Sequence, residues 1–290
     1  MLATQTCRLS RHSCIYTAYQ RSTSLSGRSV VSQRKFRMST MSEDRIAKRA
    51  CLTPTPAEYT IQTREFTYES NSKKNPTDED CELHAYFAWP AEPISEGRLL
   101  PGVLVGHTAI GMQEEFIYDR CRAIAKLGYA AFAFDLFGGG ELLMDPVKRK
   151  IKMDYLNNDR NNLVQRVTQA YGQLTRQPEV NDDKIGGIGY CLGGKAMIDL
   201  ARSGLPVRGV VSFHGILDSP QLEDNPSIKA KVLAFHGEQD PFSPKENIQA
   251  FVEEMERKGV DWQQHTYGGT LHGFTRPDKT TEQDRQAGFQ

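Results

Sequence analysis

The sequence contains few cysteines, and their spacing matches neither a disulfide framework nor a zinc site. The six cysteines stand at positions 7, 14, 51, 81, 121 and 191, with no Cys-x-x-Cys among them. No apolar stretch is long enough to span a bilayer. Gly138-Gly139-Gly140 lacks the Gly-Lys-Ser/Thr that follows in a phosphate loop. We therefore expect a reducing compartment, no membrane span, no bound metal and no cofactor.

Acidic residues are absent from residues 1–42, which carry scattered Arg and Lys among many Ser and Thr. This composition is typical of an organellar transit peptide, and the continuous apolar region of a secretory signal is missing. We expect a disordered leader over residues 1–50 and import into mitochondria. The alternative is a translation start at Met38 or Met41, which would leave a cytoplasmic enzyme.

The chain has 290 residues, of which 38% are hydrophobic, and its formal net charge is zero. This length and composition suit one catalytic domain, which we place at residues 55–290. The basic residues of the leader have no packed aromatic face beside them, so nucleic acid is not the expected partner.

Short apolar runs alternate with helical patterns along this domain. Strands are predicted over residues 64–69, 81–89, 101–107, 129–137, 185–190, 208–213 and 231–235, and helices over 114–127, 161–174 and 196–202. A capping box at residues 243–246, with Pro244 as first helical residue, predicts another helix that ends at Gly259. The alternation predicts an α/β fold, a mostly parallel twisted sheet with helices on both faces.

The most informative segment is Gly189-Tyr190-Cys191-Leu192-Gly193-Gly194, which follows a predicted strand. Gly-x-Cys-x-Gly has the spacing of a nucleophile elbow, with a thiol in place of the usual serine. The helix after the turn would direct its first N–H groups at that thiol and favour the thiolate. The alternative is a glycine-rich turn around an inert, buried cysteine.

Two further segments supply an acid and a base in the chain order of α/β-hydrolases. Asp240 follows the strand-like run 231–235, and His272 stands in the glycine-flanked loop 268–273. A thiol that attacks an acyl group needs such a base, and the base needs an orienting acid. Because ligands bind at the carboxyl ends of parallel strands, these side chains are expected at one edge of the sheet.

The motifs Gly-Tyr-Cys-Leu-Gly-Gly at 189–194, Gly-Glu-Gln-Asp-Pro-Phe-Ser-Pro at 237–244 and His-Gly-Phe at 272–274 together resemble the dienelactone hydrolase family. The resemblance runs from about residue 101 to the end, and less clearly back to about residue 60. It implies an α/β-hydrolase fold with Cys191 as nucleophile, His272 as base and Asp240 as orienter. It also implies a final helix on the sheet, so the domain is expected to be shortened at its C-terminal helix.

The same resemblance implies two arginines that hold a substrate carboxylate. Arg276 stands in one of those positions, but residues 135–140 offer no arginine for the other. A family glutamate that exchanges a proton with the thiol belongs near His107 and Thr108, and Glu114 lies several residues further along than expected. These departures leave the reaction type in place and put the diene-lactone substrate in doubt.

The expected reaction is attack by Cys191 on a small-molecule ester or lactone, with the oxyanion held by the Leu192 N–H and a backbone N–H between His107 and Ile110. Arg276 would favour substrates that bear a carboxylate. The oligomeric state stays open. Two other interpretations remain: a catalytically silent family member that binds a small molecule or a partner, and a redox-sensing thiol protein, which would need a resolving cysteine.

Several other residues are candidates for lesser roles. His214 and His236 follow strands in Phe-His-Gly, where hydrogen bonding within the turn is the expected work. Asp135 and Asp218 are less favoured alternatives to Asp240 as the acid that orients His272. The segment 138–158, which contains Lys148-Arg149-Lys150, is expected to be either a loop that shapes substrate access or a solvated basic turn.

Overall fold

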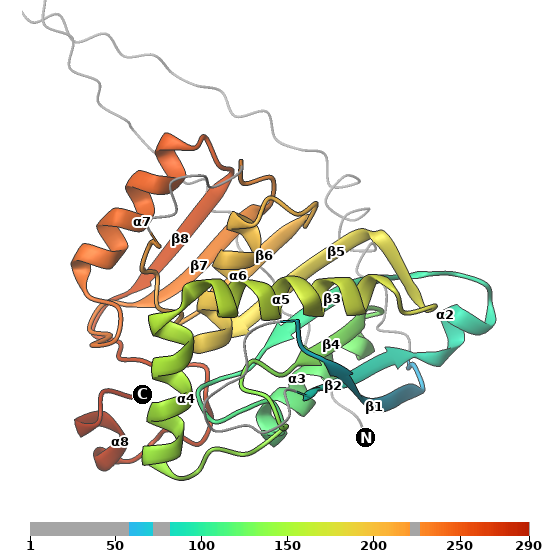
Figure 1. Cartoon of the computed structure of the whole chain (residues 1–290), viewed down its shortest axis with the longest axis horizontal. Coiled ribbons are helices and arrows are strands. Elements are labelled where there is room, and N and C mark those ends of the chain that lie inside the picture. The colour runs from blue at the N-terminus through green and yellow to red at the C-terminus, as the bar shows by residue number, and fades with distance from the viewer. Residues whose placement is uncertain (1–57, 72–81, 221–226, 290) are drawn as a thin grey trace, which may run out of the picture. The chain divides into compact units, whose positions relative to one another are not determined.

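The computed structural model describes residues 58–71, 82–220 and 227–289 (Figure 1). Eight strands form one sheet in the order β1-β2-β4-β3-β5-β6-β7-β8. The leader predicted over residues 1–50, with its import signal and alternative starts, lies outside the described residues, and so does Cys81. No helix in the described ranges has both the length and the apolar character needed to cross a membrane.

The first part of the sheet is antiparallel. β1 (Ile61–Glu69) pairs with β2 (Glu82–Pro90) in continuous register from Ile61 opposite Pro90 to Glu69 opposite Glu82. β2 then runs antiparallel to β4 (Ala130–Phe134). This confirms the two early strands expected from the alternating pattern.

The rest of the sheet is parallel. It contains β3 (Leu100–Gly106), β4, β5 (Val180–Tyr190), β6 (Gly209–Phe213), β7 (Lys231–Gly237) and β8 (Trp262–Tyr267). All five residues of β4 are buried, as expected of a parallel strand covered on both faces. The predicted strand class is confirmed, although β4 ends before Asp135 and β5 begins at Val180, before the predicted residue 185.

Helices lie on both faces of the sheet, which confirms the predicted α/β-hydrolase architecture. On one face α3 (Glu115–Lys126) buries Ile117, Cys121 and Ala125 against β2, β3 and β4. On the other face lie α5 (Arg160–Thr175), α6 (Leu192–Arg202) and α7 (Lys245–Arg257), and their apolar side chains belong to the main core. Cys121 is thus core filler, as its place on the apolar stripe predicted.

Two short helices complete the set, α2 (Ala91–Ser95) after β2 and α8 (Glu282–Gln286) near the carboxyl end. The segment 138–158 contains another helix, α4 (Pro146–Asn158), so its interpretation as a loop or turn was wrong. Asp145 caps α4 by accepting from the N–H groups of Val147 and Lys148, and Pro146 occupies the first turn.

The predicted capping box at residues 243–246 is also wrong. Pro244 is the N-cap residue of α7, and no side chain caps that helix. The buried Ser243 hydroxyl instead accepts a hydrogen bond from the N–H of Leu217, 3.2 Å away. A tertiary contact therefore replaces the local one. The end of α7 agrees with prediction, because Gly259 follows the C-cap Lys258 with φ of 62°.

A buried network of charged side chains joins α5, α6 and α7. Arg202, with 2% of its side chain exposed, pairs with Glu254, with 3% exposed, and the shortest nitrogen–oxygen distance is 2.6 Å. Arg202 also contacts Asp199 at 3.0 Å, and Asp199 in turn pairs with Arg160. These pairs connect the helices of one face behind the strands.

We expect Glu254→Gln to lower the free energy of unfolding by about 3 kcal/mol, because it leaves the buried Arg202 without its main counterion. The double variant Arg202→Met/Glu254→Leu should lose less than this single variant, since neither charge then remains buried and unpaired. Urea unfolding of both, with the exposed-pair variant Lys150→Gln as control, provides the measurement. Equal losses in the single and double variants would contradict this account.

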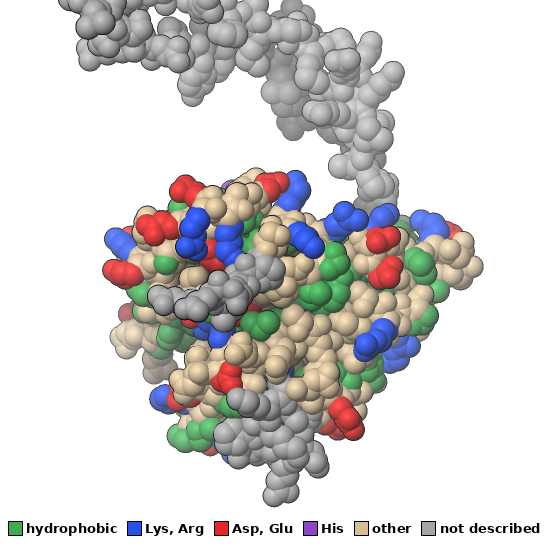
Figure 2. All heavy atoms as spheres, turned by 45° about the horizontal axis from the view of Figure 1, so that its top comes forward, with side chains coloured by type: hydrophobic (Ala, Val, Ile, Leu, Met, Phe, Trp, Pro, Cys, Tyr) green, Lys and Arg blue, Asp and Glu red, His purple; other side chains and the backbone are tan. Residues whose placement is uncertain are grey.

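Figure 2 shows acidic and basic side chains interspersed on the face that it draws, among the residues that the structure describes. The charges of one sign do not gather on one part of this face. This pattern agrees with the zero net charge of the whole chain. That face therefore shows no broad patch of one sign that would attract a polyanion.

Candidate active site

The turn between β5 and α6 places Cys191 at the edge of the sheet. Cys191 has φ of 55° and ψ of −114°, a conformation that non-glycine residues rarely adopt. Its N–H donates to the carbonyl of Phe213 at the end of β6, 3.0 Å away, which ties the strained turn to the sheet. Strain at a side chain that remains partly exposed is typical of a functional position.

Close backbone contacts explain the glycines around Cys191. A Cβ on Gly193 would lie 2.2 Å from the carbonyl carbon of Gly106, and one on Gly189 would lie 2.1 Å from the carbonyl oxygen of Gly193. Both distances are far below contact, so only glycine fits. As a result, the first turn of α6 packs directly against the ends of β3 and β5.

The other two members of the predicted triad also come together. His272 Nδ1 lies 2.7 Å from Asp240 Oδ2, although the residues are 32 positions apart in sequence. Both side chains are buried. Asp240 Oδ1 accepts from the N–H of Phe242 at 2.9 Å, which holds the carboxylate toward the ring. With Nδ1 bound to Asp240, His272 has Nε2 for its side-chain hydrogen bond to Cys191.

Electrostatics favour a thiolate and an imidazolium at this pair. Burial alone would raise the pKa of Cys191, but the charge and hydrogen bond of His272 outweigh burial and lower it. Burial alone would lower the pKa of His272, but Cys191 and Asp240 raise it to about 10. The two groups therefore stabilise each other's charged forms.

Backbone N–H groups from two segments also reach the sulfur of Cys191. The N–H groups of Leu192 and Ala109 each lower the pKa of the thiol through hydrogen bonding. Leu192 is the first residue of α6, where the helix dipole adds to the effect. Ala109 lies within the stretch from His107 to Ile110 that the sequence singled out for the second donor.

The side chain of His107 forms hydrogen bonds to the backbone of two neighbouring segments. Its Nε2 accepts from the N–H of Leu136 at 2.9 Å, and its Nδ1 donates to the carbonyl of Thr108 at 2.6 Å. Burial lowers the pKa of His107, so the ring is neutral. Its carbonyl accepts from the N–H of Gly193 at 2.8 Å. Both ring nitrogens and the carbonyl of His107 are thus engaged within the protein, which fixes the backbone next to Ala109.

Glu114 stands further along the chain than the position of the family glutamate near His107 and Thr108. In the structure it lies beside Arg276. Its Oε1 forms an ion pair with Arg276, and its Oε2 accepts from the hydroxyl of Thr108 at 2.8 Å. The loop between β3 and α3 turns back on itself, so the distance along the chain does not separate these groups. Glu114 therefore connects the loop of Ala109 to the loop of His272.

His214 forms a hydrogen bond beyond its own turn, to the loop that contains His272. It is buried with φ of 41°, and its Nε2 lies 2.8 Å from the hydroxyl of Thr275. Its ring packs edge-on against His272, with ring centroids 4.9 Å apart. Burial, with the neighbouring His272, holds the pKa of His214 well below its usual value. His214 is thus a neutral support for the loop of the base.

The carboxyl end of the described chain packs on the same loop. Gly288 accepts a hydrogen bond from the N–H of His272 at 3.0 Å, and the ring of Phe289 lies edge-on to His272. The loop of the base is held from both sides as a result. No local sequence signal indicated these contacts.

The remaining candidates have structural contacts. Asp135 accepts from the N–H groups of Phe137, Gly138 and Gly140, so it ties down its own loop. Asp218 pairs with Arg160. These carboxylates are engaged away from His272, whose partner is Asp240.

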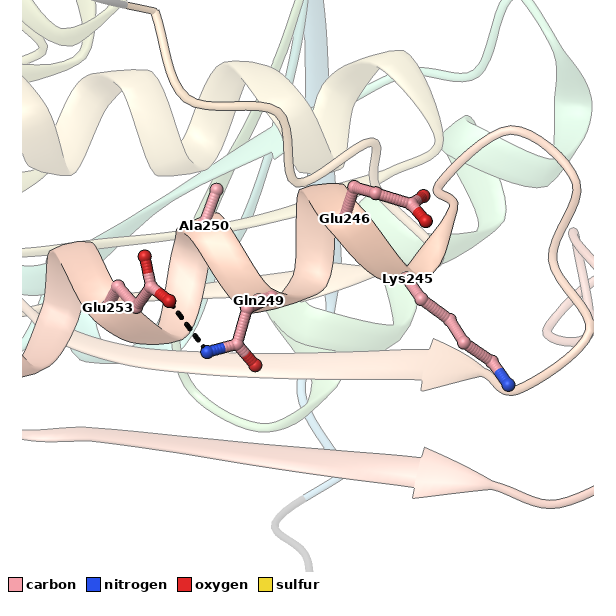
Figure 3. Close-up of a pocket in the computed structure, with 5 residues that line it drawn as sticks. All are labelled: Lys245, Glu246, Gln249, Ala250 and Glu253. Atoms are coloured by element: carbon pink, nitrogen blue, oxygen red, sulfur yellow. Dashed lines mark hydrogen bonds between the residues drawn. The ribbon is translucent and has the colours of Figure 1, made fainter.

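A surface hollow of about 450 Å³ lies along α7 and is lined by Lys245, Glu246, Gln249, Ala250 and Glu253. Figure 3 shows these side chains on one helix, with Gln249 donating to Glu253. This hollow is open to solvent and is lined largely by charged and polar side chains. Its lining includes none of Cys191, Asp240 and His272. Within residues 58–71, 82–220 and 227–289, no group of three or more His, Cys, Asp or Glu side chains is arranged to hold a metal ion.

The parallel sheet, the glycine-bounded turn after β5 and the acid and histidine after later strands define an α/β-hydrolase. A model of the dienelactone hydrolase family matches residues 83–289. The chain belongs to the dienelactone hydrolase family. Membership confirms the resemblance found in the motifs and the predicted enzyme class, a hydrolase of carboxylic esters or lactones.

Several relatives resemble the chain over most of its described domain. A dienelactone hydrolase-like promiscuous phosphotriesterase from metagenomic libraries is 32% identical with a TM-score of 0.66, covering 76% of this chain and 86% of that one. The solved structure m3DLH is 34% identical with a TM-score of 0.68, covering 77% and 88%. The carboxymethylenebutenolidase homolog of Mus musculus is 28% identical over 184 residues, or 63% of this chain and 72% of the mouse protein.

The paired charges predict unusual reactivity at Cys191. The rate at which iodoacetamide alkylates it should reach half its maximum at a lower pH than for an ordinary thiol, because the pKa of Cys191 is lowered. His272→Ala should lower the rate at pH 7 by about tenfold, because the thiolate loses its counterion. Peptide mapping measures each cysteine separately, and Cys121, whose pKa burial raises, is the internal control. A half-maximal pH in the wild type that equals or exceeds that of an ordinary thiol would contradict the ion pair.

Proposed function

We propose that the chain hydrolyses activated esters or lactones through Cys191 as nucleophile, His272 as proton carrier and Asp240 as orienting acid. The observation that carries the proposal is the 2.7 Å contact between Asp240 Oδ2 and His272 Nδ1, beside a thiol in a strained turn. Family membership supports the same reaction class. So does the mouse relative, described as a carboxymethylenebutenolidase homolog, since such an enzyme opens a lactone.

In the first step the thiolate of Cys191 attacks the acyl carbon, and the carbonyl oxygen becomes an oxyanion. The N–H groups of Leu192 and Ala109, which already reach the sulfur, are close enough to stabilise that charge. When the intermediate collapses, the bond to the leaving oxygen breaks and His272 gives its proton to that oxygen. An acyl thioester on Cys191 remains.

In the second step His272, now neutral, accepts a proton from water as the water attacks the thioester. The carbon–sulfur bond breaks, the carboxylic acid leaves, and the thiolate and imidazolium are restored. Asp240 keeps the Nδ1 proton in place, so Nε2 faces the reacting atoms in both steps. Because a thiolate is itself a good leaving group, esters with stable leaving groups suit this site better than amides.

Removal of the nucleophile or the base should abolish turnover of 4-nitrophenyl esters and small lactones. We expect Cys191→Ala and His272→Ala to lower kcat by about 10³-fold or more. Intact-mass analysis of the wild type, mixed with a slow ester, should show an acyl adduct, which peptide mapping places on Cys191. Turnover that survives in Cys191→Ala would overturn the mechanism. A folded wild type that binds these compounds without turnover would support the silent binding protein instead.

Asp240→Asn should separate orientation from proton transfer. The amide retains the shape of the side chain but does not stabilise an imidazolium, so we expect kcat to fall by about 10³- to 10⁴-fold with little change in KM. The pH at which half of Cys191 is alkylated should also rise. Asp218→Asn is the matched control, because Asp218 pairs with Arg160 away from His272. Equal kinetics of Asp240→Asn and wild type would remove Asp240 from the proposal.

A further inference from the structure

Arg276 has its guanidinium bound to two carboxylates of the chain itself. Its Nε and Nη2 each donate to Asp278 at 2.9 Å, and its Nη1 forms an ion pair with Glu114. The group lies 5.4 Å from the centre of the Phe116 ring and has only 9% of its side chain exposed. Three of its five N–H donors and one of its faces are therefore engaged.

Glu114 is held in this position. Only 11% of its side chain is exposed, and its second oxygen accepts from the hydroxyl of Thr108. Thr108 in turn accepts from the N–H of Ile110 at 3.1 Å. The carboxylate is therefore built into the loop that carries the Ala109 N–H. A substrate carboxylate that replaced it on Arg276 would leave a buried, unpaired anion behind.

The segment 138–158 does not offer a replacement for the missing arginine. Arg149 donates to the carbonyl of Leu143 at 3.1 Å, Lys150 pairs with Asp154, and the buried Lys152 donates to the carbonyl of Gly138. These cations are engaged within their own segment.

The exposed side chains on the same segment are mainly apolar. They are Leu142, Met144, Val147 and Ile151, with between 42% and 69% of each exposed. The start of the segment packs on the loop of the oxyanion donors, because the N–H of Leu143 donates to the carbonyl of Ile110 at 2.7 Å. The segment beside the loop of Ile110 therefore presents uncharged side chains at its surface.

We infer that the site selects uncharged esters and lactones and discriminates against substrates that bear a carboxylate, because Glu114 and Asp278 already neutralise Arg276. This inference rests on the proposed hydrolysis by Cys191. It reverses the expectation from the sequence, in which Arg276 alone suggested a carboxylate-bearing substrate. A carboxylate substrate would approach a guanidinium whose single positive charge is already offset by two neighbouring anions, and both would repel it.

A pair of isosteric substrates tests the inference. The mono-4-nitrophenyl ester of hexanedioic acid carries a distant carboxylate, and its monoamide counterpart carries a neutral carboxamide of the same shape. We expect the wild type to hydrolyse the amide-bearing ester with a kcat/KM about tenfold higher, after the uncatalysed rate is subtracted. The ratio of the two kcat/KM values within one protein cancels differences in folding or active fraction.

Neutral isosteres at the two carboxylates should move that ratio. Asp278→Asn, at an exposed position, should raise relative activity on the carboxylate ester by severalfold. Glu114→Gln/Asp278→Asn should raise it further, and the gain should disappear when Arg276→Gln is added. Glu115→Gln is the matched control, because the neighbouring carboxylate is 72% exposed and pairs with Arg122.

The outcomes separate this inference from the proposed function. If the wild type prefers the carboxylate ester and Cys191→Ala abolishes turnover of both esters, the mechanism stands and the inference fails. A ratio that is the same in wild type, Asp278→Asn and the double variant would also overturn it. If neither ester is turned over through Cys191, the proposed function fails first. The inference is supported if the ratio of the two kcat/KM values shifts in the variants at Asp278 and Glu114 and does not shift in Glu115→Gln.

Discussion

The site depends on how closely two backbones approach each other where α6 begins. Gly193 lies against Gly106, and Gly189 lies against Gly193, at separations that exclude any side chain. This contact brings the first N–H groups of α6 to the edge of the sheet and forces Cys191 into its positive φ. A side chain at Gly189 or Gly193 would push the two backbones apart. The thiol of Cys191 would then move away from His272 and from both N–H donors. Packing at the glycines therefore sets the geometry on which the chemistry depends.

The same packing makes the charges tolerable. A thiolate, an imidazolium and a carboxylate stand in a row, and burial by itself disfavours the charged forms of Cys191 and His272. Each survives because its neighbour carries the opposite charge and donates or accepts a hydrogen bond. Neutral His214, packed against His272, adds contact without adding a competing charge. The loop of the base can thus be rigid without opposing the imidazolium.

Local sequence predicted the parts of this structure that local chemistry determines. Glycine spacing around Cys191, apolar strand runs and the order of Asp240 and His272 gave the fold and brought the right residues to one edge. Prediction from local sequence failed where contacts between distant segments determine the position of a side chain. Ser243 matched a helix cap but bonds to Leu217, and Glu114 meets Arg276 only because a loop folds back. The helix α4 was missed despite Asp145 and Pro146, an available start signal.

Glu114 shows why specificity and geometry are not independent here. It neutralises Arg276 and also holds Thr108, so a change at this position alters the charge near the substrate and the loop of the oxyanion donors together. Asp278 neutralises the same guanidinium from an exposed position, and it forms ion pairs with Arg276 and Lys279. Substitution at Asp278 can therefore alter charge selection while leaving the catalytic loops intact. Under the proposed mechanism, charge selection can thus be altered separately from the catalytic loops at Asp278, whereas Glu114 connects the two.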